Sequence, residues 1–126
     1  MRPAGWLLML PLAVQAACPA APATAQTVRQ GGVQAAWWPE PAPIVVGQPF
    51  VLQLQLCPAD AQLLRVDATM PDHRHGMNYR PSLKPGAGGR WQAEGLLWHM
   101  PGRWELRLDV RSGGAEHRLL QSVTLP

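Results

Sequence analysis

Methionine and histidine occur together in this sequence in a pattern that suggests metal chemistry. After residue 25 the chain contains three methionines, and each of them lies within three residues of a histidine. The first group is the segment 70–77, Met-Pro-Asp-His-Arg-His-Gly-Met, and the second is the segment 99–102, His-Met-Pro-Gly. Alternate side chains of an extended backbone share a face, so we expect His73, His75 and Met77 to point the same way.

These donor types favour copper. A thioether is a soft, uncharged donor suited to Cu(I), and imidazole binds both oxidation states, so a mixed site can hold Cu(I) by preference and also accept Cu(II). Zinc prefers thiolate, imidazole and carboxylate ligands. We expect the carboxylate of Asp72 to orient one of the imidazoles. The candidate ligands of a copper ion are His73, His75, Met77, Met70, His99 and Met100.

Some of these residues also have a purely structural interpretation. Met70 ends an apolar strand face, where it can pack in the core, and Met100 precedes Pro-Gly, where it can fill the end of the fold. His73, His75 and Met77 occupy a polar loop, where burial explains them less well. His117 lies on the apolar face of the last predicted strand and is expected to be a core or edge residue. The tryptophans are expected mainly to pack, although one near the site can shield Cu(I) or contact it through its ring.

Alternation of apolar and polar residues predicts an all-β protein. In 50–57 and in 103–111 every second residue is apolar, as in an antiparallel sheet with one face in water, and no segment has a convincing helical period. The segments 33–38, 63–70, 79–83, 91–97 and 117–125 are weaker strand candidates. About seven strands in a chain of this length are typical of an immunoglobulin-like antiparallel β-sandwich.

The order of these strands predicts where the Met and His groups lie. In an up-and-down succession, the connections after every odd strand lie at one pole of the sandwich. The connection containing 70–77 and the one containing His99 and Met100 are both of this kind, so they should meet. Cys57 ends the second strand and is expected at the opposite pole, where it is no ligand.

The N-terminus resembles a secretory signal. Arg2 precedes an apolar run from Trp6 to Val14 that is too short to span a membrane, and no later segment is long enough either. Ala23-Thr24-Ala25 suggests cleavage before Gln26, which makes 1–25 a signal peptide and 26–126 a single periplasmic domain. The alternative is a lipoprotein cut before Cys18, because Gln15-Ala16-Ala17-Cys18 resembles a lipobox.

Charge and cysteine content narrow the function further. The chain has eleven Lys and Arg residues and eight Asp and Glu residues, a formal net charge of +3. The basic residues form no block, so no nucleic-acid binding is expected. Cleavage before Gln26 would remove Cys18 and leave Cys57 alone. We then expect no intrachain disulfide, and a Cys57 thiol that is sheltered or pairs between molecules.

The Met and His segments resemble a known family. The motifs Met-Pro-x-His-x-His-Gly-Met at 70–77, Tyr-Arg-Pro at 79–81, Glu-Gly-Leu at 94–96 and His-Met-Pro-Gly-Arg-Trp-Glu-Leu at 99–106 are similar to those of YtkA-like and FixH-like exported domains. The resemblance covers most of 26–126. It implies a small β-sandwich outside the cytoplasm, in some cases linked to copper handling or to the assembly of copper-containing oxidases. FixH-type members keep an N-terminal membrane span, which is not expected here.

Two functions therefore compete. The first is a copper carrier or buffer that passes its ion to a copper-receiving envelope protein by ligand exchange. The second is a metal-free interaction module that docks through a Met- and Trp-rich pole, since methionine adapts well to partners. The sequence shows neither a nucleophile with a base at suggestive spacing nor paired carboxylates, so no enzyme activity is expected.

Overall fold

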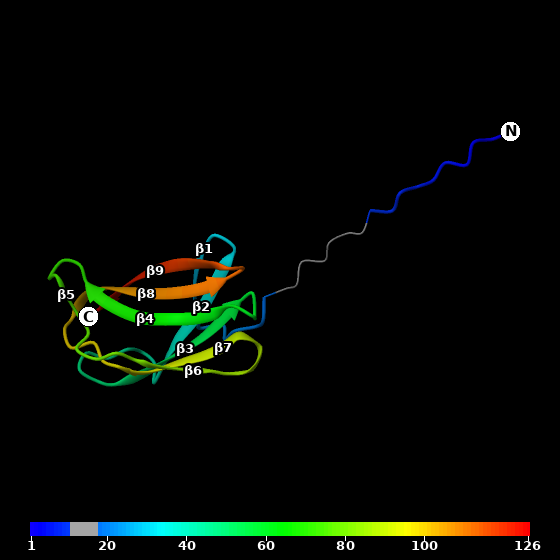
Figure 1. The fold of residues 1–126 in the computed structure, drawn as a ribbon. Coiled ribbons are helices and arrows are strands. Elements are labelled where there is room, and N and C mark those ends of the chain that lie inside the picture. The colour runs from blue at the N-terminus through cyan, green and yellow to red at the C-terminus, as the bar shows by residue number, and fades with distance from the viewer. Residues whose placement is uncertain (11–17) are drawn as a thin grey trace.

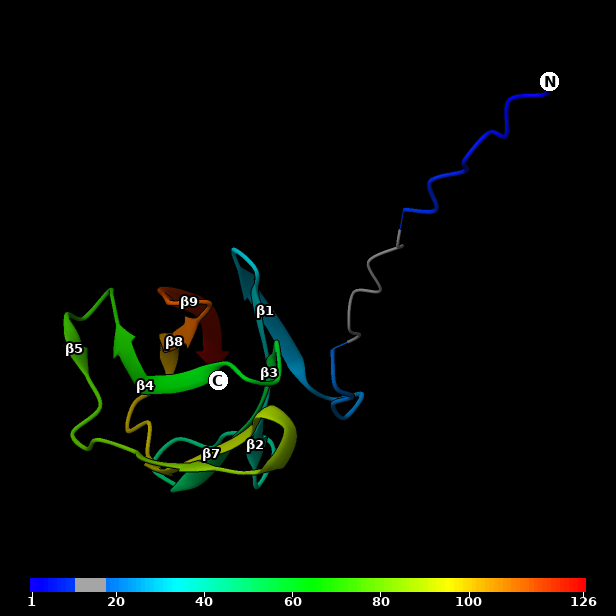
Figure 2. The same ribbon diagram turned by 45° about the vertical axis from the view of Figure 1, so that its right-hand side comes forward.

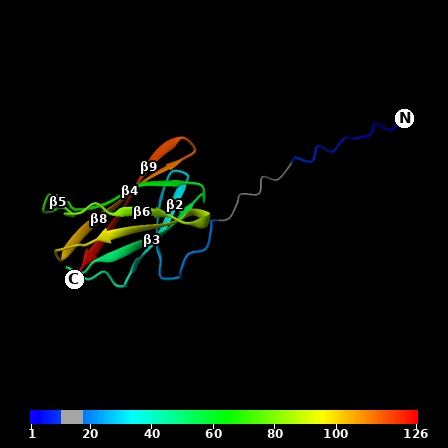
Figure 3. The ribbon, with the colours of Figure 1, turned by 60° about the horizontal axis from the view of Figure 1, so that its bottom comes forward.

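The computed structural model describes residues 1–10 and 18–126, and the described chain forms a sandwich of two antiparallel sheets (Figure 1). The first sheet contains, in spatial order, β1 (Gln26–Gln30), β2 (Val33–Glu40), β3 (Phe50–Cys57), β7 (Arg90–Leu96) and β6 (Ser82–Pro85). The second contains β5 (His75–Gly76), β4 (Gln62–Met70), β8 (Gly102–Ser112) and β9 (Ala115–Leu125). Figure 2 and Figure 3 show the two layers from other directions. The prediction of an all-β antiparallel sandwich is confirmed.

The number of strands differs from the seven expected, because the described residues form nine. β1 is polar and largely exposed, so it carries no apolar alternation, and it is held through backbone pairing with β2 along its whole length. β5 has only two residues. β6 begins at Ser82 and not at Tyr79, whose side chain is exposed. A 3-10 turn, η1 (Ala87–Gly89), precedes β7.

The core lies between the inner faces of the two sheets. In β8 the four alternate apolar residues from Trp104 to Val110 are fully buried, and the residues between them face outward. The alternate apolar residues of β3, from Phe50 to Leu56, are buried in the same way. Removing these faces from water is the main stabilising contribution to such a fold.

Both Met and His segments lie at one end of the sandwich, as strand order predicted. β4 ends at Met70 and β8 begins at Gly102, and the two strands pair in antiparallel register. The ring of Phe50, at the start of β3, meets that of Trp98 in the β7–β8 connection. We call the segments 70–77 and 97–102 together the His/Met end. Cys57, at the other end of β3, lies at the opposite end of the sandwich.

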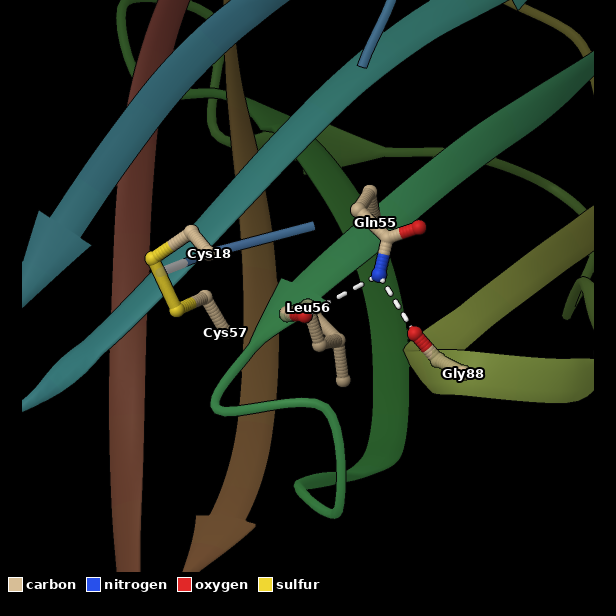
Figure 4. The surroundings of a disulfide bond; sticks show 5 residues. All are labelled: Cys18, Gln55, Leu56, Cys57 and Gly88. Carbon is tan, nitrogen blue, oxygen red and sulfur yellow. Dashed lines mark hydrogen bonds between the residues drawn. A yellow bond between two sulfur atoms is a disulfide. The ribbon is translucent and has the colours of Figure 1, made fainter. Parts of the chain in front are cut away.

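The prediction that Cys57 has no partner in its own chain is wrong. Cys57 forms a disulfide with Cys18, with their Cα atoms 5.3 Å apart (Figure 4). Sequence reasoning excluded this bond because it placed Cys18 in a removed leader. A chain cut before Gln26 cannot contain it.

The first ten residues present their apolar side chains to solvent. Trp6, Leu7 and Leu8 are each more than four-fifths exposed. The rest of the predicted apolar run, and most of the predicted lipobox at 15–18, fall on 11–17 and lie outside the described residues. In the described part of the chain, no helix has the length and apolarity needed to cross a membrane.

Candidate metal site

The first part of the site is a hairpin that β4 makes with β5. The chain turns at 71–74, where the amide of His73 donates to the carbonyl oxygen of Met70 at 3.1 Å, and His75 then pairs opposite Met70. Residues directly opposite each other in an antiparallel pair lie on the same face of the sheet. Met70 is fully buried, so His75 projects from the inner face at the edge of the core.

His73 reaches this neighbourhood by a different route from the one expected. The segment 73–77 is not one extended strand, because Arg74 adopts a left-handed conformation with φ of 55° inside the turn. The turn nevertheless stacks the ring of His73 on that of His75, with centroids 5.7 Å apart and planes 28° apart. Both side chains are exposed. The expectation that an extended backbone gives His73, His75 and Met77 a common face is therefore wrong, although the rings of His73 and His75 do stack.

The second part of the site is the β7–β8 connection, which two buried indoles support. Trp98 and Trp104 are fully buried and stack at 5.3 Å with planes 10° apart. Trp104 Nε1 donates a hydrogen bond to the carbonyl oxygen of Met100 at 3.0 Å. The carbonyl oxygen of Trp98 accepts from the amide of Gly47 at 2.8 Å, which ties the β2–β3 loop to the same connection.

His99 connects the two parts. Its ring centroid lies 5.5 Å from that of His75. His99 and Trp104 pack edge to face, with their ring centroids 5.6 Å apart. The Nδ1 atom of His99 is buried and has no hydrogen-bond partner among residues 1–10 and 18–126. Leaving such a group unpaired costs free energy, so a buried orphan nitrogen calls for a water, an ion or a functional explanation.

The three methionines differ in accessibility. Met70 is fully buried in the core, whereas Met77 and Met100 are partly buried and pack against the core from its edge. The methyl end of Met70 approaches Gly102 so closely that a Cβ there would lie 3.1 Å from it, and Gly102 has a φ of +118°. Glycine is thus needed at the start of β8 for both space and backbone conformation. The packing interpretation fits Met70 better than ligation does.

Asp72 does not hold an imidazole, contrary to expectation. Its two carboxylate oxygens accept hydrogen bonds from Arg103, at 3.3 Å from Nε and 3.1 Å from a terminal nitrogen. This exposed ion pair joins the β4–β5 turn to the beginning of β8 and so fixes the two parts of the site relative to each other. Hydrogen bonds from Arg103, and secondarily its charge, lower the pKa of Asp72, and the nearby His73 adds a smaller lowering effect.

We expect the Asp72–Arg103 pair to stabilise the fold at neutral but not at acid pH. Because the pKa of Asp72 is lower in the folded protein than the ordinary 3.8, its contribution is present above that value and is lost as the pH falls through the folded pKa. Asp72→Asn should therefore lower the midpoint of thermal unfolding at pH 7. The two proteins should converge at the most acid pH at which both stay folded. A pH-independent difference would contradict this.

The described side chains do not form a complete set of metal ligands. In 1–10 and 18–126, no three His, Cys, Asp or Glu side chains are already arranged to hold a metal ion. A metal about 2 Å from an imidazole nitrogen lies roughly 3 Å from the ring centre, so rings 5.5 and 5.7 Å apart are within reach of one ion. The ring planes are 28° apart for His73 and His75 and 33° apart for His75 and His99, and these rings are not yet arranged around a metal ion, so the exposed rings of His73 and His75 would have to rotate to bind one.

Other residues behave as the packing interpretations predicted. His117 is an edge residue, and its Nδ1 atom lies 2.9 Å from Oε1 of Gln30. The complete burial of Trp98 and Trp104 keeps their indoles off the surface, so a docking surface at this end would be formed by Met77 and Met100 without them. Arg103 is the contributor that sequence reasoning missed. Its position next to the His-Met-Pro-Gly segment was the only signal available.

Comparisons with known proteins leave the family open. No family model matches the sequence, and neither the search of curated proteins nor that of solved structures found a match. The similarity to YtkA-like and FixH-like domains therefore stays a prediction from the motifs at 70–81 and 94–106.

Proposed function

We propose that this protein is an exported copper carrier or buffer that binds its ion at the His/Met end. The observation that carries the proposal is that His75 lies between the ring of His73, in its own segment, and the ring of His99, which comes from a segment far away in the chain. Nothing in the packing of the core requires the two exposed rings to be there. A cluster of imidazole donors with partly buried thioethers at the edge of the core suits copper better than hard cations.

The residues present fit a copper ion in two respects. The unpartnered Nδ1 of His99 is buried, and a metal would give its lone pair a partner. Met77 and Met100 are partly buried at the edge of the core, so their flexible thioethers are not sealed inside it. In this assignment His73, His75 and His99 supply nitrogen donors, and Met77 and Met100 supply soft sulfur donors that favour Cu(I). Met70 packs beneath them.

This arrangement suits transfer better than catalysis. His73 and His75 are exposed, so a partner protein can replace them one at a time, while the half-buried methionines keep hold of the ion. We propose that the receiving partner is a copper-dependent protein of the cell envelope. The Cys18–Cys57 disulfide supports a location outside the reducing cytoplasm, because disulfides persist in oxidising compartments.

Anaerobic titration with Cu(I) against a chromophoric competitor tests the proposal. A variant with His73→Ala, His75→Ala and Met77→Ala should bind Cu(I) about tenfold or more weakly, a difference of ~1.4 kcal/mol or more in binding free energy. His99→Ala should also weaken binding, because it removes the nitrogen that already lacks a partner.

The matched control is His117→Ala. It removes one imidazole from β9, opposite Val110 and away from the His/Met end, and should leave Cu(I) affinity unchanged. Circular dichroism must show that every variant keeps its strands, and His73→Ala with His75→Ala alone gives a version that touches only exposed side chains. Equal affinity of the triple variant and the unaltered protein would remove the proposed function.

A further inference from the structure

The disulfide constrains how the N-terminus is processed. Cys18 lies eight residues before β1, and Cys57 is the last residue of β3, so the bond joins the leading segment to the first sheet (Figure 4). Both sulfurs must be present in the folded chain as thiols before they can be joined. Cleavage before Gln26 would discard Cys18. Lipid attachment at Cys18 would occupy its sulfur in a thioether.

The sulfur of Cys57 is presented from a rigid strand end. Next to it, the buried side chain of Gln55 donates from Nε2 to the carbonyl oxygens of Leu56 at 3.1 Å and Gly88 at 2.8 Å. The bond to Gly88 holds the end of β3 against the η1 turn. At Gly89 a Cβ would come within 2.9 Å of Ala59, which shows how closely the turn packs there. The strand end that carries Cys57 is therefore anchored by contacts other than the disulfide.

The disulfide restrains the segment that precedes β1. This segment follows the surface into β1, with a turn in which the amide of Ala25 donates to the carbonyl oxygen of Pro22 at 3.0 Å. Thr24 borders an apolar depression with Trp37 and Val123. β1 itself is a five-residue edge strand with few buried side chains, and such strands fray easily. A covalent link ahead of β1 limits that fraying and so helps to keep Gln30 against His117.

We propose that the mature protein keeps Cys18, unlipidated, in an intrachain disulfide with Cys57, and that the leader is cut upstream of Cys18. Upstream of Cys18, Ala16 and Ala17 follow the apolar run and Gln15, so a small residue can stand immediately before the cut. The bond forms when the two thiols exchange with a protein disulfide of the export compartment. The Cys18–Cys57 S–S bond is made as the S–S bond of the oxidant breaks, and two electrons and two protons pass to the oxidant, which is left as its dithiol. This inference does not depend on copper binding.

The test is the covalent structure of the protein purified from the envelope of an exporting bacterium. Intact mass and peptide mapping without reductant, after alkylation of free thiols, should show an N-terminus before Cys18, no lipid, and a peptide pair linked through Cys18 and Cys57. The mass should be lower by two hydrogens than that of the reduced chain. An N-terminus at Gln26, a lipid on Cys18, or alkylation of both cysteines would each overturn the proposal.

Two variants separate the possible cleavage sites. Ala25→Leu blocks a cut before Gln26 and should leave the processing site unchanged, whereas Ala16→Leu with Ala17→Leu should impair removal of the leader. Cys18→Ser should be exported and should make Cys57 available for alkylation. If Ala25→Leu alone stops processing, the cut lies before Gln26 and the disulfide is absent from the mature protein.

Discussion

Reduction of the Cys18–Cys57 bond is expected to lower the free energy of unfolding by about 3 to 4 kcal/mol. The bond spans 39 residues, and closing a loop of that length removes much conformational entropy from the unfolded chain. For a domain of this size, such a loss lowers the midpoint of thermal unfolding by roughly 15 to 25 °C. Thermal unfolding followed by circular dichroism, with and without reductant, measures it.

The control is a variant with both Cys18→Ser and Cys57→Ser. Its midpoint should match that of the reduced protein, and reductant should not move it. Cys57→Ser alone should behave in the same way as long as dimers through Cys18 are excluded by size-exclusion chromatography. A midpoint that does not respond to reductant in the unaltered protein would mean that the bond adds nothing to the stability of the fold.

The strands that sequence patterns predicted well are those with one face in the core. The expected strand 103–111 corresponds to β8, Gly102–Ser112, because its alternate residues are buried without exception up to Val110. β1 was not predicted because backbone pairing with β2 holds it in place. Its mostly polar side chains show no apolar alternation that would indicate a strand. The same limit applies to β5, whose two residues carry no period at all.

The meeting of the two Met and His segments was also predictable, because it depends only on strand order. Their detailed contacts were not. The stacking of His73 on His75 depends on the left-handed conformation of Arg74, and the Asp72–Arg103 pair joins residues 31 positions apart. The residues around Asp72 and Arg103 in the sequence do not indicate that these two side chains form an ion pair.

The disulfide was missed through an assumption about processing. The sequence contains two cysteines, and in a chain expected to be exported an even number favours a pair. The small-residue pattern at Ala23-Thr24-Ala25 instead predicts cleavage before Gln26, which would remove Cys18 from the mature protein. Spatial proximity of Cys18 to Cys57 could not be inferred, because the segment before β1 has no periodicity that would place it.

Trp104→Ala is the substitution expected to destabilise the core most, by about 3 to 5 kcal/mol. The side chain is fully buried, stacks on Trp98 and meets His99, so truncation removes a large apolar surface and leaves a cavity beside these two residues. Trp91→Ala is the control, because it also removes an indole but from a position that is less buried. Trp91 is only partly buried in β7, so chemical denaturation should show a distinctly smaller loss.

Trp104→Phe separates packing from hydrogen bonding at the same position. Phenylalanine keeps a ring against Trp98 but cannot donate to the Met100 carbonyl, so stability should fall by about 1 to 2 kcal/mol. Amide hydrogen exchange in 98–102 should accelerate, because that bond holds the connection in place. If the indole bond positions Met100 for copper, Cu(I) affinity should fall as well, while Trp91→Phe leaves it unchanged. An unaltered affinity with faster exchange would mean that Met100 packs without binding the metal, which would leave Met77 as the soft donor beside the three imidazoles.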